Sequence, residues 1–265
     1  ISAQYYNAPL IVMYSGGKDS EVLLKLAKIA GIDFEVQHNH TTADAPETVY
    51  HVRETFRQLE LEGIPCTINY PYYKGKRVSM WTLIPQKLMP PTRLARYCCD
   101  VLKERNGKNR CIVTGVRWAE SNSRANNRYF IDPGKKDTNG HWIGFADNDE
   151  SRREFEACSI KSKTTINPIA RSEHLLMNSL YECGFDRVGC IGCPMASKKR
   201  IVEFARYPKF EANYRRAFAQ MLSARTAAGK PTTWKTPDDV FRWWMEDKNV
   251  IGQLHFYETG EISYG

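Results

Sequence analysis

Six consecutive residues near the start of the chain could form a cradle for phosphate groups. They are Ser15, Gly16, Gly17, Lys18, Asp19 and Ser20. Two adjacent glycines allow a sharp turn whose free N–H groups point at an anion, and Lys18 adds a positive charge. Ser15 and Ser20 are expected to place hydroxyl donors at the rim. The spacing differs from the Gly-x-x-x-x-Gly-Lys-Ser loop of the common nucleotide triphosphatases, because the second glycine follows the first immediately.

The flanking sequence supports this interpretation of the loop. An apolar run at residues 10–14 precedes it, and residues 22–27 have the apolar spacing of a helix. The order of buried strand, glycine turn and amphipathic helix directs a helix N-terminus at the ligand. A simple turn that caps a helix is the alternative, and the strand and helix on either side make it the less favoured one.

Four of the eight cysteines form two close pairs at spacings that suit a metal site. Cys98 and Cys99 are adjacent, while Cys190 and Cys193 form a Cys-x-x-Cys motif closed by Pro194. Four thiolates suit either structural zinc or a [4Fe–4S] cluster. Zinc sites usually use two well-separated Cys-x-x-Cys motifs, which an adjacent pair fits poorly. A [4Fe–4S] cluster is therefore favoured, with zinc, a redox-active pair and plain core thiols as alternatives.

The net charge of +8 is concentrated in residues 198–235. This basic segment holds ten lysines and arginines against two glutamates, so ten minus two gives +8 and the rest of the chain is neutral. A concentrated basic segment indicates a polyanionic partner, with nucleic acid as the leading candidate, and a solvated helical face as an equally weighted alternative. Its aromatic residues recur at three- and four-residue steps, so we expect most of them in the core.

Strands and helices alternate along the first part of the chain, which predicts a parallel sheet of an α/β fold. Strands are expected at residues 10–14, 34–37, 66–70 and 110–116. Arg117 and Arg124 follow the last of these and could meet phosphates, or form a surface ion pair instead. We expect a nucleotide-binding domain with the cysteine pairs at residues 1–195 and a basic helical C-terminal extension packed on it at 196–265.

No apolar run approaches the ~20 residues of a membrane span, and no secretory signal peptide is visible. Eight cysteines in such a chain favour a reducing compartment, where thiols serve metals or catalysis. We therefore expect a cytoplasmic protein without a membrane partner. Association with a second copy of the chain is left open.

With the loop and the cysteines both in view, the chain resembles the phosphoadenosine phosphosulfate (PAPS) reductase family, within the PP-loop ATP pyrophosphatases. The resemblance implies an adenine-nucleotide α-hydrolase-like fold, a three-layer sandwich with a central parallel sheet, plus a C-terminal helical region. It implies that residues 15–20, with Thr41 and Gly115, hold the nucleotide. Lys18, Asp19, Arg117 and Arg124 would be catalytic. Cys98, Cys99, Cys190 and Cys193 would ligate the cluster.

Two departures from the reductases affect the expected chemistry. Reductases proper use a C-terminal cysteine as the sulfur nucleophile, and no cysteine follows Cys193 in this sequence. Reductases also tend to carry a degraded phosphate loop, whereas this loop is intact. The stretch between Ile169 and Cys183 is also short, where relatives usually have a Trp-containing helix. The missing cysteine and the intact loop favour ATP-driven activation over the reduction of a sulfonucleotide, whereas the short stretch affects only what is expected of the specificity pocket.

We therefore expect an ATP pyrophosphatase that adenylylates a substrate for sulfur transfer, using ATP, Mg²⁺ and a [4Fe–4S] cluster. It would be similar to the iron–sulfur sulfurtransferases of DNA phosphorothioation. DNA or tRNA would be the acceptor, bound through residues 198–235, and a cysteine desulfurase the sulfur donor. The alternatives are an adenylyl-sulfate or PAPS reductase that uses a thiol on a partner, and a non-catalytic nucleotide- and iron-sensing DNA-binding module.

Overall fold

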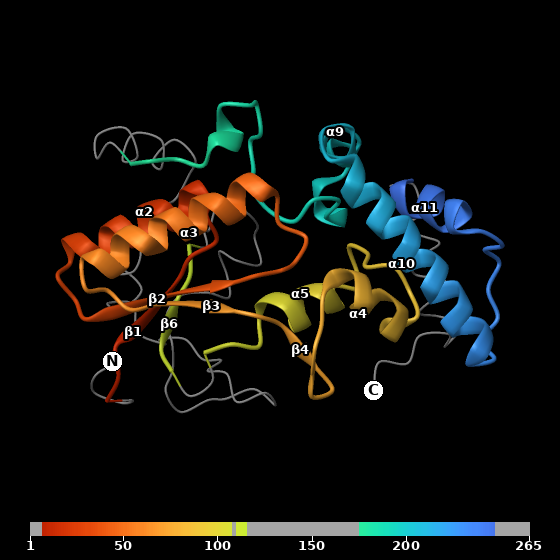
Figure 1. The fold of residues 1–265 in the computed structure, drawn as a ribbon, viewed down its shortest axis with the longest axis horizontal. Coiled ribbons are helices and arrows are strands. Elements are labelled where there is room, and N and C mark those ends of the chain that lie inside the picture. Colours follow the sequence, from red (N-terminus) through yellow and green to blue (C-terminus); the bar gives the residue numbers. More distant parts are fainter. Residues whose placement is uncertain (1–6, 108–109, 116–174, 247–265) are drawn as a thin grey trace, which may run out of the picture. The chain divides into compact units, whose positions relative to one another are not determined.

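A computed structural model describes residues 7–107, 110–115 and 175–246 of the chain. These residues fall into two compact units that interleave along the sequence (Figure 1). The first unit is drawn from Ile1–Asn39, Pro46–Asn69 and Arg105–Val188, and the second from His40–Ala45, Tyr70–Glu104 and Gly189–Gly265. Part of the N-terminal half thus packs in the second unit, and the domain boundary expected at residue 195 stays a prediction.

The first unit is built on a four-stranded parallel sheet with strand order β3-β2-β1-β6. Its elements are β1 (Leu10–Met13), α2 (Lys18–Ile29), β2 (Phe34–Asn39), α3 (Pro46–Leu61), β3 (Cys66–Asn69), β6 (Ile112–Val113) and the 3₁₀ turn η2 (Ser179–Tyr181). Val12 pairs with Val36 on one side and with Val113 on the other. The central parallel sheet expected from the alternation of strands and helices is confirmed.

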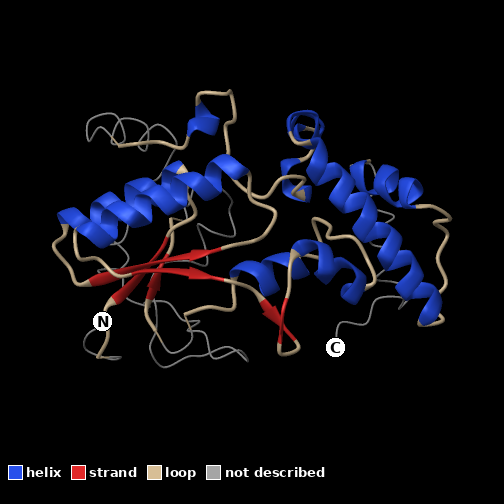
Figure 2. Cartoon of the chain, in the orientation of Figure 1, coloured by secondary structure: helices blue, strands red, loops and turns tan. Residues whose placement is uncertain are grey.

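Helices α2 and α3 lie on the same face of this sheet (Figures 1 and 2). This follows from the strand order, because two successive right-handed crossovers in one direction place both helices on one side. Phe34 and Val36 point from β2 into a core that includes Val52, Phe56 and Leu59 of α3. The described residues of this unit show one helical layer, formed by α2 and α3.

The second unit is mainly helical. Its elements are the two-stranded hairpin of β4 (Tyr72–Tyr73) and β5 (Lys76–Arg77), α4 (Met80–Lys87), α5 (Tyr97–Lys103), the 3₁₀ turn η3 (Pro194–Ala196), α9 (Lys199–Arg206), α10 (Pro208–Ala227) and α11 (Pro237–Met245). Local signals set several helix starts. Ser79 and Thr236 form capping boxes at the starts of α4 and α11, and Pro208 and Pro237 occupy first-turn positions. The hairpin has no counterpart among the expected elements.

Aromatic side chains form the core of the second unit. Tyr214 on α10 has its ring centroid 4.6 Å from that of Trp244 on α11 and 4.8 Å from that of Trp81 on α4. Phe204 and Phe218 are buried in the same group. The expectation that most aromatics of the basic segment belong to the core is confirmed. Over the part of the chain that the structure describes, no helix is both long and apolar enough to span a bilayer.

Candidate functional site

The glycine loop joins β1 to α2 in the first unit. Gly16 has φ +72°, a conformation that side chains other than glycine rarely adopt, and a Cβ there would lie 3.0 Å from Val52 Cγ2. Gly17 is the N-cap of α2 in an extended conformation, and no side chain caps the helix there. The N-cap residue itself therefore supplies no side-chain acceptor at the positive end of α2, where a phosphate-binding loop places its ligand.

The two loop serines have different roles. Ser20 is buried, and its hydroxyl donates to the Gly17 carbonyl at 2.7 Å. It also accepts hydrogen bonds from the backbone N–H and the hydroxyl of Ser15, each at 3.2 Å. Ser20 therefore braces the turn from within, whereas Ser15 is exposed at the rim, where the sequence placed both hydroxyls.

The segment around η2 contacts the loop, although it lies more than 160 residues away in the sequence. The buried side chain of Asn178 donates to the Gly16 carbonyl at 3.2 Å and to Thr48 Oγ1 at 3.1 Å. The Lys18 N–H donates to Tyr181 Oη at 3.0 Å. One of the N–H groups at the start of α2 that could bind an anion is therefore already hydrogen-bonded. Sequence analysis missed Asn178 and Tyr181, because no local pattern links them to the loop.

The Lys18 ammonium lies at the exposed side of the loop, beside the segment around η2. Lys18 Nζ lies 3.4 Å from the Asp186 carbonyl oxygen and 5.2 Å from the centre of the Tyr181 ring. Gly115, just after β6, approaches the first turn of α2 so closely that a Cβ would lie 2.9 Å from the Asp19 carbonyl oxygen. A glycine is therefore required at 115 for the strand and the loop to meet.

A buried polar network brackets the loop. Tyr14 precedes the loop and Glu21 follows it, and the Tyr14 hydroxyl donates to the Glu21 carboxylate. His51 Nε2 contacts the same carboxylate and lies 3.0 Å from Tyr14 Oη, and Thr55 Oγ1 lies 3.1 Å from that oxygen. Burial, and then the charge of Glu21, raises the pKa of Tyr14 far above its ordinary value. Both ends of the loop are thus fixed to α3.

The described structure leaves three further residues expected at the nucleotide as predictions. Thr41 belongs to the second unit, where its hydroxyl accepts from Cys190 Sγ at 3.3 Å and its N–H donates to Asp44 at 2.9 Å. Arg117 and Arg124 lie outside the described residues.

The four paired cysteines all belong to the second unit. Cys98 and Cys99 lie in the first turn of α5, and Cys190 and Cys193 lie in the turn before η3. Cys190 forms a β-bridge with Asp44. A hydrogen bond with Cys99 and burial raise the pKa of Cys98, and the charges of Cys190 and Cys193 raise it further, so the two pairs interact electrostatically. Two pairs about 90 positions apart in the sequence thus lie within electrostatic range of each other.

The turn between Cys190 and Cys193 is held by contacts on each of its residues. Ile191 N–H donates to the Ala43 carbonyl at 2.8 Å, and the Ile191 carbonyl accepts from Tyr214 Oη at 3.0 Å. Gly192 has φ +74°, and its N–H donates to the Glu203 carboxylate at 2.7 Å. The sulfur atoms of this pair are therefore positioned by the backbone and core of the second unit.

Positive groups surround the thiols. Arg96 Nη2 lies 3.3 Å from Cys99 Sγ. A hydrogen bond from Cys98, together with one from Arg96, lowers the pKa of Cys99 to about 5, whereas the same Cys99 contact raises the pKa of Cys98. Burial raises the pKa of Cys190 to about 11, and the charge of Cys190 in turn raises the pKa of Lys103. Two cations near these thiols suit an anionic metal–thiolate group. Among the described residues, the ligand atoms that lie within 4.8 Å of one another are instead those of His38, His40 and Asp44.

In metal-free protein we expect Cys99 to be the first cysteine alkylated by iodoacetamide at mildly acidic pH. Its folded pKa of about 5 lies below the ordinary thiol value, so the thiolate persists until the pH falls through about 5. Cys66 and Cys190, with pKa values of about 11, should remain protonated thiols. Mass spectrometry of peptides after brief labelling at several pH values measures this order.

Arg96→Ala should slow the labelling of Cys99, because it removes a hydrogen-bond donor to the thiolate. Arg93→Ala is the matched control, since Arg93 is an exposed cation three positions earlier in the chain. Equal labelling of Cys99 in the wild type and in Arg96→Ala would contradict the assigned role of Arg96.

The basic segment presents fewer surface charges than its sequence suggested. Arg200 is buried and donates to the Trp244 carbonyl at 2.9 Å, and Arg225 is buried and donates to the Leu88 carbonyl at 2.9 Å. Arg215 pairs with Glu211 and Asp238. The exposed cations of the segment are Lys198, Lys199, Arg206, Lys209, Arg216, Lys230 and Lys235. The other three of its ten cations thus serve the fold of the second unit.

Comparison with known proteins identifies the family of the chain. The sequence profile of the phosphoadenosine phosphosulfate reductase domain matches residues 9–196. The uncharacterized proteins MJ0066 and MJ0973 of Methanocaldococcus jannaschii are 26% and 28% identical over 214 and 200 residues, covering 76% and 72% of this chain. These alignments cover 39% and 42% of the relatives, so the chain spans about two fifths of their length.

A solved structure is also similar. The phosphoadenylyl-sulfate (PAPS) reductase of Candida auris, in its phosphate complex, aligns with a TM-score of 0.44 at 14% sequence identity. The alignment covers 69% of this chain and 81% of that one.

Proposed function

Because the chain belongs to the phosphoadenosine phosphosulfate reductase family, we propose that it cleaves ATP at the loop of residues 15–20 to activate a substrate for sulfur transfer. The observation that carries this proposal is the geometry of the loop. Gly16 holds the left-handed turn, Gly17 leaves the start of α2 uncapped, and Lys18 stands at the open side. The family match by itself indicates a nucleotide-binding domain of a sulfur-related enzyme family.

The proposed reaction is an adenylyl transfer. An oxygen of the acceptor attacks the α-phosphorus of ATP, the bond to the β-phosphate oxygen breaks, and pyrophosphate leaves. The Lys18 ammonium and the positive end of the α2 dipole would offset the charge that builds on the leaving group. Asp19 would hold Mg²⁺, which neutralises phosphate charge when bound. A sulfur nucleophile then displaces AMP, which departs with the acceptor oxygen.

Cys98, Cys99, Cys190 and Cys193 would hold a [4Fe–4S] cluster in the second unit. Their sulfur atoms are positioned by α5 and by the turn at Gly192, and Arg96 and Lys103 balance negative charge beside them. A bound cluster supplies electron transfer or sulfur handling. Zinc is the alternative occupant of the same thiols, and metal analysis of anaerobically purified protein distinguishes the two.

The acceptor is proposed to be a nucleic acid, DNA or tRNA, with a cysteine desulfurase as sulfur donor. The support is the exposed cations of the basic segment, which lie on α9, on α10 and in the chain that follows α10. The second candidate function is reduction of an adenylylated sulfate with a thiol supplied by a partner. The family match to a reductase domain favours this candidate.

Anaerobic incubation of the purified protein with ATP and Mg²⁺, with and without nucleic acid, tests the proposal. We expect pyrophosphate release that nucleic acid stimulates. Absence of pyrophosphate under both conditions, together with tight binding of adenylyl sulfate, would establish the reductase instead. Adenylyl imidodiphosphate has a nitrogen bridge between its β and γ phosphates and an ordinary oxygen bridge between its α and β phosphates. Because the proposed reaction breaks only the α–β bridge, this analogue should still be cleaved and release imidodiphosphate.

A further inference from the structure

The hairpin of β4 and β5 lies in a second basic stretch of the second unit. Between Glu62 and Asp100 the sequence has no acidic residue. It has six cations over the same interval, namely Lys74, Lys76, Arg77, Lys87, Arg93 and Arg96. This stretch is separate from residues 198–235. Its positive charge does not appear in the net charge of the chain, because acidic residues elsewhere cancel it. Exposed cations without acidic neighbours in the sequence attract polyanions.

The backbone of the hairpin presents its side chains on two faces. Tyr72 pairs with Arg77 and Tyr73 with Lys76, joined by a two-residue turn at Lys74 and Gly75. Both turn residues have positive φ, +50° and +75°, as a type I′ turn requires. Residues that pair across an antiparallel ribbon share a face, so Tyr72 and Arg77 lie on one side and Tyr73 and Lys76 on the other.

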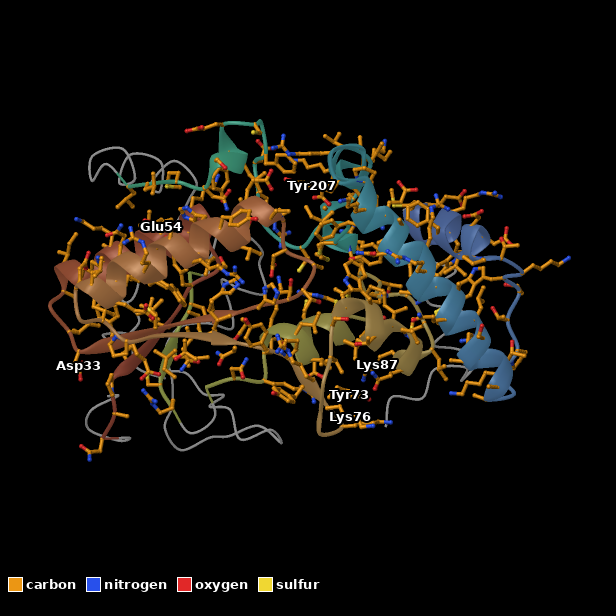
Figure 3. All side chains as sticks on the ribbon, in the orientation of Figure 1. Asp33, Glu54, Tyr73, Lys76, Lys87 and Tyr207 are labelled. Atoms are coloured by element: carbon orange, nitrogen blue, oxygen red, sulfur yellow. The ribbon has the colours of Figure 1, made fainter. Side chains whose placement is uncertain are left out.

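One face is anchored to the unit by Lys87. Its Nζ lies 4.5 Å from the centre of the Tyr73 ring, and Figure 3 shows Tyr73, Lys76 and Lys87 grouped where the hairpin meets the end of α4. The other face carries an aromatic platform. The Arg77 guanidinium stacks 3.7 Å from the centre of the Tyr70 ring, and Tyr72 beside it is 58% exposed.

The charges at the hairpin are presented to solvent. Lys74, Lys76 and Arg77 are all exposed, and no ion pair involves them within the described residues. Lys74 is also an unusual choice at its position, because asparagine and glycine adopt positive φ far more readily than lysine. The chain thus carries a cation at the tip of the turn at some cost in backbone energy.

We propose that this hairpin binds unpaired nucleotides of a nucleic acid. Lys74, Lys76 and Arg77 contact phosphates, and the exposed ring of Tyr72 stacks on a base. Cations interleaved with aromatic rings are the usual surface for single strands, since every base offers a π-face. An acidic polypeptide would use the cations but not the exposed ring. The hairpin binds whether or not the loop of the first unit cleaves ATP.

Fluorescence anisotropy with a labelled single-stranded oligonucleotide of mixed sequence tests the proposal at several salt concentrations. Lys74→Asn is the central variant, because Asn-Gly is a favoured type I′ turn and the midpoint of thermal unfolding should stay equal or rise. Its affinity should nevertheless fall. Removing all three cations, as K74N/K76Q/R77Q, should reduce the slope of log K against log salt by about 2, since each phosphate contact contributes about 0.7.

Tyr72→Ala should weaken binding by about 5- to 100-fold, and Tyr72→Phe should restore most of it, because stacking needs the ring alone. Arg53→Gln, which removes one exposed cation of the first unit, is the control for net charge. Equal affinity of wild type and K74N, or no loss in Tyr72→Ala, would overturn the proposal. So would tighter binding of duplex, polyglutamate or anionic vesicles than of the single strand.

The proposed nucleic-acid binding by the hairpin and the proposed ATP reaction can be tested independently. Hairpin variants should release pyrophosphate from ATP at the wild-type basal rate when nucleic acid is absent. If K74N/K76Q/R77Q lost that basal release as well, the hairpin would belong to the ATP reaction, and its assignment to nucleic acid would be wrong.

Discussion

Lys18→Ala is expected to lower pyrophosphate release from ATP by about 100- to 1000-fold, the usual loss when one charge-stabilising group of a transition state is removed. Negative charge grows on the leaving pyrophosphate as the bond to the α-phosphorus breaks, and Lys18 stands at the open side of the loop. The loss should therefore fall mainly on kcat rather than on KM. A coupled pyrophosphate assay over a range of ATP concentrations measures both.

The fold should tolerate this change. The Lys18 ammonium contacts only the Asp186 carbonyl and the Tyr181 ring among the described residues, and the backbone N–H that donates to Tyr181 remains in the variant. We expect the free energy of unfolding to change by less than about 0.5 kcal/mol. Lys25→Ala, on the same helix two turns away, is the matched control and should keep its activity. A normal kcat in Lys18→Ala would show that Lys18 is not a catalytic residue.

Gly192→Ala is expected to destabilise the second unit and to abolish metal binding. Gly192 has φ +74°, and a Cβ there would lie 2.5 Å from Phe204 Cζ and 2.8 Å from Tyr214 Cε2. The left-handed conformation costs about 1 kcal/mol for alanine. The clash adds roughly 1–3 kcal/mol, because both rings are packed in the aromatic core and cannot move freely.

The displaced turn would carry Cys190 and Cys193 with it. Urea unfolding and iron content of the anaerobically purified protein measure the two effects together. Gly229→Ala separates backbone strain from the clash, since Gly229 has φ +64° in the same unit and a Cβ added there would meet nothing within 4 Å. It should cost about 1 kcal/mol and keep the iron. Full iron content in a stable Gly192→Ala protein would show that the turn does not position the metal.

Several features were determined by the sequence alone, because they depend on neighbouring residues. Adjacent glycines after an apolar run specify a turn from strand to helix, and the structure places Gly16 in the left-handed region there. The alternation of strands and helices specifies parallel pairing through right-handed crossovers. The aromatic spacing after residue 198 predicted the core of the second unit. The identities of the nucleotide, the metal and the acceptor remain predictions.

Other features were decided only by the tertiary structure. Asn178 and Tyr181 reach the loop across more than 160 residues, and no local pattern encodes such a contact. The fate of a charge also depends on distant partners. The sequence suggests that Arg200 and Arg225 are surface cations. In the structure both are buried, and they donate hydrogen bonds to the carbonyls of Trp244 and Leu88.

The same reason explains the two units. Packing between distant segments, rather than a boundary in the chain, decides which parts belong together. Cys98 and Cys99 therefore share a unit with Cys190 and Cys193, although most of the chain between the two pairs belongs to the other unit. Sequence spacing identified the thiols as pairs, since each pair is local. Their common place is set by α5, the Gly192 turn and the aromatic core, which form only when the chain has folded.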